Sequence, residues 1–169
     1  MSTSKEIVVQ DACVLFDLID LGLIGLFFDL ELTVVTTNQV IKEVEDGEQL
    51  SVVTEFISSG KLLLDNDGTF EEISRILDEN SGLSFADSSV LEVAIRKKGA
   101  VLSSDLKLRN ATVRSRLTVR GILWIIGELQ ACEHLTKAEA IEKLKMYQNI
   151  NDRAPRAEIK IMIERLSEQ

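Results

Sequence analysis

Two aspartates in the stretch from Ser84 to Arg109 are the first residues whose type and spacing indicate chemistry. The sequence SFADSSVLEVAIRKKGAVLSSDLKLR reads as a helix, a turn at one glycine, a short apolar strand and the start of another helix. Asp87 lies in the first turn of the helix, and Asp105 lies where the strand ends. Because ligands bind outside the carboxyl ends of strands in a parallel α/β sheet, we expect both carboxylates at that edge.

Two further acids occupy comparable places earlier in the chain. Asp11 follows the short β-branched run IVVQ, which predicts a buried first strand. Glu43 lies within a helix that is predicted to begin at Thr37 or Asn38 and to end near Gly47. The pattern puts Glu43 at the edge of the packed face of this helix, where it can face the same edge of the sheet.

Each of these acids also has an ordinary structural explanation. Asp11 and Asp105 are suitable helix N-caps, and Ser84 with Asp87 is close to a capping box. Glu43 could be one more charge on a helix surface. The four together are harder to explain in this way, because carboxylates held close to one another repel and raise each other's pKa.

A bound cation removes that repulsion, and the residue types indicate which cation. Ligands that are all oxygen select hard ions such as Mg²⁺ or Mn²⁺, which are held with several waters and a substrate phosphate. Such an ion can generate hydroxide and neutralise the charge that develops when a phosphodiester is cleaved. The acids therefore predict metal-assisted phosphoryl chemistry.

The basic residues of the chain are concentrated around Asp105. The segment from Arg96 to Arg120 has a net charge of +7, although the whole chain has a net charge of −9. A segment of this kind can follow the phosphates of a nucleic acid, or it can be a solvated face. Its basic residues are Arg96, Lys97, Lys98, Lys107, Arg109, Arg114, Arg116 and Arg120.

Short apolar runs alternate with helical patterns along the chain, which predicts an α/β fold with a parallel sheet between helices. We expect about five short strands, at residues 7–10, 32–36, 61–64, 100–104 and 117–119. Further helices are predicted after residue 120.

Composition limits the other possibilities. The single histidine, His134, excludes sites built on several histidines. Cys13 and Cys132 are predicted to be buried free thiols in a reducing compartment. The first residues do not form a secretory signal, and the apolar run at 21–28 is too short to cross a bilayer. We therefore expect a cytoplasmic protein with no membrane partner.

The four acidic motifs resemble those of the PIN-domain family, small α/β nucleases that include the toxins of many bacterial and archaeal toxin–antitoxin pairs. The resemblance covers roughly residues 7–120, in the order of the family. It implies a three-layer α/β/α nuclease domain over residues 1–120, with a C-terminal helical extension, residues 121–169, packed on the same domain. The motifs are the strand before Asp11, VIKEV with Glu43, LSFADSSVLEVA with Asp87, and VLSSDLKLRNA with Asp105.

The resemblance also implies an activity, a Mg²⁺- or Mn²⁺-dependent ribonuclease that hydrolyses phosphodiester bonds. Asp11, Glu43, Asp87 and Asp105 would be its catalytic and metal-binding residues. Some family members carry a further acid after the fourth, where this chain has Lys107 and Leu108. The implied partners are RNA, a small antitoxin protein and a second copy of the chain. The residues expected to contact the substrate are Ser103, Ser104, Lys107, Arg109, Arg114 and Arg116.

Two other functions remain open at this point. One is a degenerate domain of the same fold that binds RNA or a protein without cutting it. The other is an unrelated phosphohydrolase with an acidic site that acts on small molecules, although a small substrate does not need so broad a basic segment. A neighbouring gene for a DNA-binding antitoxin would favour the toxin.

Overall fold

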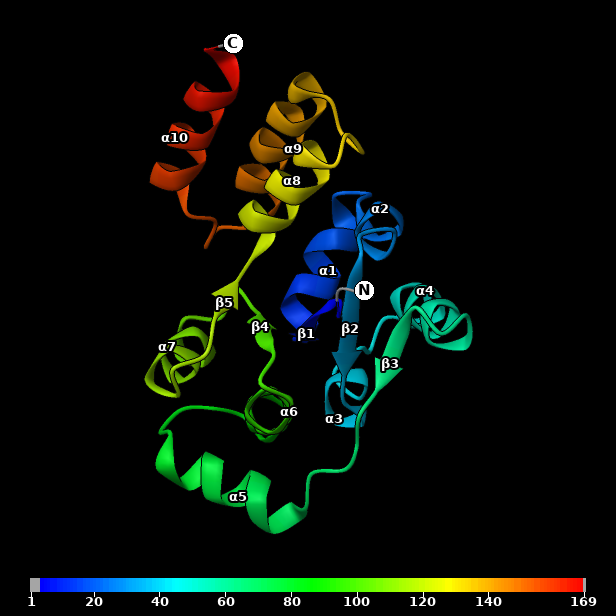
Figure 1. Cartoon of the computed structure of the whole chain (residues 1–169), viewed down its shortest axis with the longest axis vertical. Helices are drawn as coiled ribbons and strands as arrows, with labels where there is room; N and C mark the ends of the chain where they lie inside the picture. The colour runs from blue at the N-terminus through cyan, green and yellow to red at the C-terminus, as the bar shows by residue number, and fades with distance from the viewer. Residues whose placement is uncertain (1–3, 169) are drawn as a thin grey trace.

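The computed structural model describes residues 4–168, and its centre is a five-stranded sheet with helices on both sides (Figure 1). All strands are parallel, in the order β3-β2-β1-β4-β5. The predicted α/β fold is confirmed, with the last three strands shorter than expected. The strands are β1 (Glu6–Gln10), β2 (Leu32–Thr36), β3 (Leu62–Leu64), β4 (Ala100–Leu102) and β5 (Val119–Arg120).

The strand order places a topological switch point at the centre of the sheet. Val8 of β1 lies opposite Val34 of β2 on one side and Ala100 of β4 on the other. The chain adds β2 and β3 outward from β1, and then returns to add β4 and β5 on the opposite side. The crevice between the carboxyl ends of β1 and β4 is therefore where an open parallel sheet presents its ligand site.

Ten helices connect and extend the strands within residues 4–168. None of those helices is both long enough and apolar enough to cross a membrane. The helices are α1 (Ala12–Asp20), α2 (Ile24–Phe28), α3 (Asn38–Ile41), α4 (Gly47–Ser58), α5 (Phe70–Glu79), α6 (Phe85–Lys97), α7 (Leu106–Arg114), α8 (Ile122–Ala131), α9 (Lys137–Ile150) and α10 (Arg156–Ser167).

Helix α6 is the central helix on its side of the sheet. It packs across β1 and β4, and it is buried over most of its circumference from Ala86 to Ala94. Val90 and Leu91 on this helix, like Val8 and Val9 of β1, are fully buried. Burial of one such side chain stabilises the fold by about 1.5–3 kcal/mol, so α6 holds its N-terminal turn firmly at the carboxyl edge of the sheet.

Helices α8, α9 and α10 gather at the end of the molecule opposite α5 (Figure 1). The apolar sequence of α8 is explained by its position, because it packs against α1, α2 and α9. Ile125, Ile126 and Leu129 of this helix are fully buried. A capping box starts α9, with Thr136 and Glu139 satisfying each other's backbone amides.

The helix predicted around Glu43 is shorter than expected. Helix α3 ends at Ile41, and Glu43 lies in the turn that follows, with its amide bonded to the carbonyl of Val40. The reason is a competing start signal, because Asp46 caps α4 by accepting a hydrogen bond from the amide of Gln49. The side chain of Glu43 is exposed instead of lying at the edge of a packed helix face.

The prediction for the cysteines is correct for their free thiols and wrong for the burial of Cys132. Neither Cys13 nor Cys132 is in a disulfide, but Cys132 is exposed. Helix α8 ends at Ala131, so Cys132 lies after the helix. The spacing of the buried residues of α8 therefore does not extend to it. Cys13 is half-buried near the start of α1.

Candidate active site

The site is built around Asp11, which follows β1 at the switch point. Asp11 is 4% exposed and caps α1, with Oδ1 accepting a hydrogen bond from the amide of Ala12 at 2.6 Å. Its Oδ2 accepts hydrogen bonds from the Ser103 hydroxyl at 2.7 Å and from the Cys13 thiol at 3.0 Å. Burial raises the pKa of Asp11, and the charge of Asp87 adds to the rise, whereas these hydrogen bonds oppose it.

Glu43 and Asp87 lie within electrostatic reach of Asp11. Partial desolvation raises the pKa of the exposed Glu43 side chain, and the charges of Asp11 and Asp87 raise it further. Asp87 is half-buried, and its Oδ2 accepts a hydrogen bond from the amide of Ser84 at 2.9 Å in the predicted capping box. The carboxylates that follow β1, lie in the turn after α3 and lie in the first turn of α6 therefore influence one another electrostatically.

Asp105 is connected to this group through Ser103. Its amide donates to the Ser103 hydroxyl at 3.0 Å, and the same hydroxyl donates to Asp11. The carboxylate of Asp105 caps α7 by accepting from the amide of Leu108 at 3.0 Å. Ser103 is fully buried, so it orients Asp11 and the start of α7 and is placed to hold the site together, not to touch a substrate.

The remaining residues that were expected to contact a substrate lie in two places. Ser104, Lys107 and Arg109 are at the carboxyl edge, beside Asp105, where all three line one groove. Arg109 also braces the edge, because its Nη1 donates to the carbonyls of Ser103 at 2.7 Å and of Arg120 at 3.2 Å.

Arg114 and Arg116 do not join the acids. The guanidinium of Arg114 donates to the side chain of Asn80 at 3.1 Å. Arg116 lines a hollow with Lys98 and the first residues of β1 and β4, at the amino edge of the sheet. The basic segment is therefore divided between the two ends of the sheet, because α7 runs from one edge to the other.

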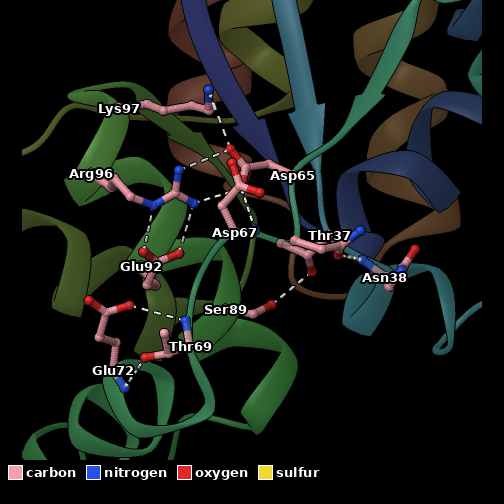
Figure 2. Close-up of polar contacts among 11 residues, drawn as sticks. Thr37, Asn38, Asp65, Asp67, Thr69, Glu72, Ser89, Glu92, Arg96 and Lys97 are labelled. Carbon is pink, nitrogen blue, oxygen red and sulfur yellow. Dashed lines mark hydrogen bonds and ion pairs between the residues drawn. The ribbon is translucent and has the colours of Figure 1, made fainter.

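A second carboxylate cluster lies at the end of β3, and the sequence reasoning did not find it (Figure 2). Asp65 and Glu92 are buried and share Arg96, which donates to Asp65 at 2.6 Å and to Glu92 at 2.8 Å. Lys97 lies 3.3 Å from Asp65. We call these four residues the ion-paired cluster. The hydrogen bond from Arg96 is the largest cause that lowers the pKa of Asp65, to about 2.

The ion-paired cluster also leaves no room for a side chain at Gly68, in the loop before α5. A Cβ atom added at Gly68 would overlap the Glu92 carboxylate. The same loop leads to Thr69 and Glu72, which form the capping box that starts α5 (Figure 2). The i,i+4 spacing of Glu92 and Arg96 was the one signal in the sequence that could have indicated this pair.

Cys13 is not an activated nucleophile. Burial raises the pKa of its thiol to about 12, and the negative charge of Asp11 acts in the same direction. A thiol with this pKa stays protonated and donates to Asp11. Its contribution to the site is therefore a hydrogen bond to Asp11.

The acid site has the donor chemistry for a hard cation, although the donors are not gathered tightly. Among residues 4–168 there is no group of three or more His, Cys, Asp or Glu side chains close enough to hold an ion directly. None of the four acids forms an ion pair with another described residue. Unneutralised carboxylates that oppose one another suit Mg²⁺ or Mn²⁺ held partly through water, so the residues fit the ion.

The fold and the acids at its switch point define an α/β protein with an acidic site, and comparison with known proteins gives its family. The model of the family DUF3368, described as a PIN domain, matches residues 7–168. This match spans nearly the whole chain, so the protein belongs to this PIN-domain family. A search of curated proteins found no match.

A solved structure supports the fold independently. The structure described as the crystal structure of PAE2754 from Pyrobaculum aerophilum is similar, with a TM-score of 0.53 and 17% sequence identity. The similarity covers 76% of this chain and 99% of that chain. At this identity the likeness shows the fold alone.

Proposed function

We propose that this protein is a Mg²⁺- or Mn²⁺-dependent RNA endonuclease whose acid site hydrolyses phosphodiester bonds. The observation that supports this most is the state of Asp11, a buried carboxylate at the switch point with two acidic neighbours and no cationic partner among the described residues. Membership of a PIN-domain family supports nuclease chemistry. The basic residues beside Asp105 support a polyanionic substrate.

The residues of the chain have separate roles in this proposal. Asp11, Glu43 and Asp87 hold the ion, with Asp105 contributing from the start of α7. Ser103 and Cys13 fix the orientation of the Asp11 carboxylate through their hydrogen bonds. A bound Mg²⁺ or Mn²⁺ supplies an activated water and neutralises charge on the phosphate. Lys107 and Arg109 attract the flanking phosphates.

The biological role forms part of the same proposal. We place the enzyme in the cytoplasm, as the toxin of a toxin–antitoxin pair, with a small antitoxin or a second copy as its protein partner. Two free cysteines are consistent with a reducing compartment. A short antitoxin reading frame beside the gene, and growth arrest when the protein is expressed without it, are the expected findings.

A second function is favoured by one observation. The acids are not gathered into a direct metal-binding group within the described range, and Lys107 stands where some family members have an acid. Both facts suit a degenerate PIN domain that binds RNA or a protein without cleavage.

Cleavage of a labelled structured RNA separates the two functions. We expect cutting that needs Mg²⁺ or Mn²⁺ and that falls by at least about 100-fold in Asp11→Asn and in Asp87→Asn. Asp78→Asn, an exposed acid on α5, is the matched control and should cut like the wild type. No cutting by the wild type, or equal cutting by all variants, would remove the catalytic assignment and favour the degenerate domain.

A further inference from the structure

A groove of about 900 Å³ begins at the acid site and extends well beyond Lys107 and Arg109, the two of its residues used in the function proposed above. It runs between the starts of α7 and α8 on one side and the connection from α9 to α10 on the other. Asp105 forms part of its wall, so the groove and the acid site are continuous. Its volume is within the range of pockets that hold a ligand the size of a nucleotide.

The groove is mostly basic at its polar positions. Lys107, Arg109 and Arg153 line it, together with Arg120 of β5, against the two acids Asp105 and Glu158. Arg153 is exposed, and its side chain has no hydrogen bond or ion pair to any residue in the range 4–168. Its charge is therefore available to an anion.

The start of α8 adds a second feature that suits an anion. This ten-residue helix begins after Gly121, and no side chain caps its first amides. Ile122 and Leu123, which carry these amides, line the groove. Free amides at a helix N-terminus, together with the helix dipole, bind phosphate groups.

Tyr147 provides an independent indication of a ligand. Its side chain is 2% exposed and lines the groove, yet its hydroxyl has no hydrogen-bond partner among the residues described. A hydroxyl that has no partner in the chain and opens to the groove is free to bond to a ligand there. The guanidinium of Arg120, which lies 4.3 Å from the ring centroid of Trp124, has a buried Nε that is also unpaired.

We propose that this groove holds one unpaired nucleotide of the RNA, next to the phosphodiester that is cut. The phosphate lies at the start of α8 and near Arg153, and the Tyr147 hydroxyl donates to an acceptor on the same nucleotide. The apolar wall formed by Val119, Leu123 and Trp124 contacts the base. This inference rests on the proposed function, and it limits the substrate to RNA that is single-stranded beside the cut, because a base inside a duplex is stacked and cannot enter.

The test measures binding without cleavage, so that it does not depend on catalysis. A fluorescent single-stranded oligoribonucleotide is titrated with the full chain in EDTA, and its anisotropy is followed. We expect Arg153→Gln to weaken binding about 5- to 10-fold and to lower the slope of log K against log salt by about 1. Tyr147→Phe should weaken binding about 3- to 10-fold, and Glu158→Gln should strengthen it about 2- to 3-fold.

Arg156→Gln is the matched control for charge, since Arg156 is exposed at the start of α10 and does not line the groove. It should bind within about 2-fold of the wild type. A perfect duplex of the same sequence should bind about 10-fold more weakly than the single strand. The thermal midpoints of all variants should match, which shows that the loss is not a folding defect.

Three results would overturn the inference. They are equal losses in Arg153→Gln and Arg156→Gln, binding of the duplex as tight as that of the single strand, and a Tyr147→Phe variant that binds like the wild type. Tight binding of free uridine monophosphate that Arg153→Gln weakens would reassign the groove to a small nucleotide. If the wild type does not cut RNA but these binding differences remain, the nuclease proposal fails and the groove survives as a binding site.

Discussion

The acid site and the ion-paired cluster are two groups of carboxylates at the same sheet, and they differ in one respect. In the ion-paired cluster, Asp65 and Glu92 are held by Arg96, and Asp65 also lies beside Lys97. In the acid site, Asp11 is equally buried, but its hydrogen bonds come from neutral donors and its charged neighbours are acids. The ion-paired cluster has its compensating positive charge within the chain, whereas the acid site has none among the described residues.

The pKa values follow this difference. The hydrogen bond from Arg96 lowers the pKa of Asp65 to about 2, whereas burial raises the pKa of Asp11. Asp17 on α1 is an intermediate case, because its partner is the neutral amide of Asn151, and burial raises its pKa to about 6. Carboxylate burial alone therefore does not distinguish a structural group from a functional one. The distinguishing property is whether the compensating positive charge comes from the chain itself.

Removal of the cation from the ion-paired cluster should have the largest effect on stability. Arg96→Met keeps the aliphatic stem but leaves Glu92 buried without a cation and Asp65 with Lys97 alone, which should lower the free energy of unfolding by about 2–4 kcal/mol. Urea denaturation measures this loss. Lys61→Met, which breaks the exposed pair with Asp29, is the control and should change stability by no more than about 1 kcal/mol.

Supply of a cation to the acid site should have the opposite effect. Mn²⁺ at 100 times its dissociation constant should stabilise the wild type by about 2.7 kcal/mol, seen as a rise in thermal midpoint. Asp11→Asn should lose most of that rise. Because the pKa values of Asp11 and Glu43 are raised, protons should displace the ion at a higher pH than they would from ordinary carboxylates. An equal rise in both proteins would place the ion elsewhere.

The same substitution at the two buried aspartates should change stability in opposite directions when metal is absent. Asp65→Asn removes a charge that Arg96 stabilises, and it should cost about 1–2 kcal/mol at pH 7. This cost should disappear as the pH falls from about 3.8 towards 2, the interval between the ordinary pKa and the lowered value. Asp11→Asn removes a charge that has no partner, and it should leave stability unchanged or raise it by up to about 1 kcal/mol. Losses of equal size would contradict the distinction between the two groups.

The smallest change in stability at pH 4 is expected at Asp17. Its raised pKa means that the folded state binds a proton more tightly than the unfolded state, so its contribution is complete below pH 3.8 and is lost as the pH rises to about 6. Asp17→Asn should therefore flatten the pH dependence of stability in that interval while changing stability at pH 4 by less than about 1 kcal/mol. A curve with unchanged slope would show that Asp17 does not titrate there.

The sequence predicted the fold and the position of two acids at one edge of the sheet, whereas the role of these acids as a catalytic site stays a prediction. Strand–helix alternation predicted all five parallel strands, and the carboxyl ends of β1 and β4 placed Asp11 and Asp105 at one edge. Local patterns succeed here because capping and strand burial are properties of neighbouring residues. Glu43 shows the limit, since the helix that should carry it ended early at a competing cap on Asp46.

The ion-paired cluster and the groove depend on tertiary contacts that no local pattern contains. Arg96 counted as part of a basic segment until the fold placed Asp65 against it, 31 residues earlier in the chain. Tyr147 read as a helix residue, and only the packing of α9 brings it to the groove beside Asp105. The contacts of a long side chain depend on which distant residues the folded backbone brings near it. These contacts are therefore the part of a site that the sequence predicts least well.

The ion-paired cluster restricts which residues can replace Gly68 in the neighbouring loop. The Glu92 carboxylate occupies the space that any side chain at position 68 would need, and two hydrogen bonds to Arg96 prevent it from moving aside. A surface loop that touches no substrate should thus accept almost no replacement at this one position. In a mutational scan scored for abundance, substitutions at Gly68 should be depleted like those in the hydrophobic core, and Arg96→Met should partly restore them by releasing Glu92.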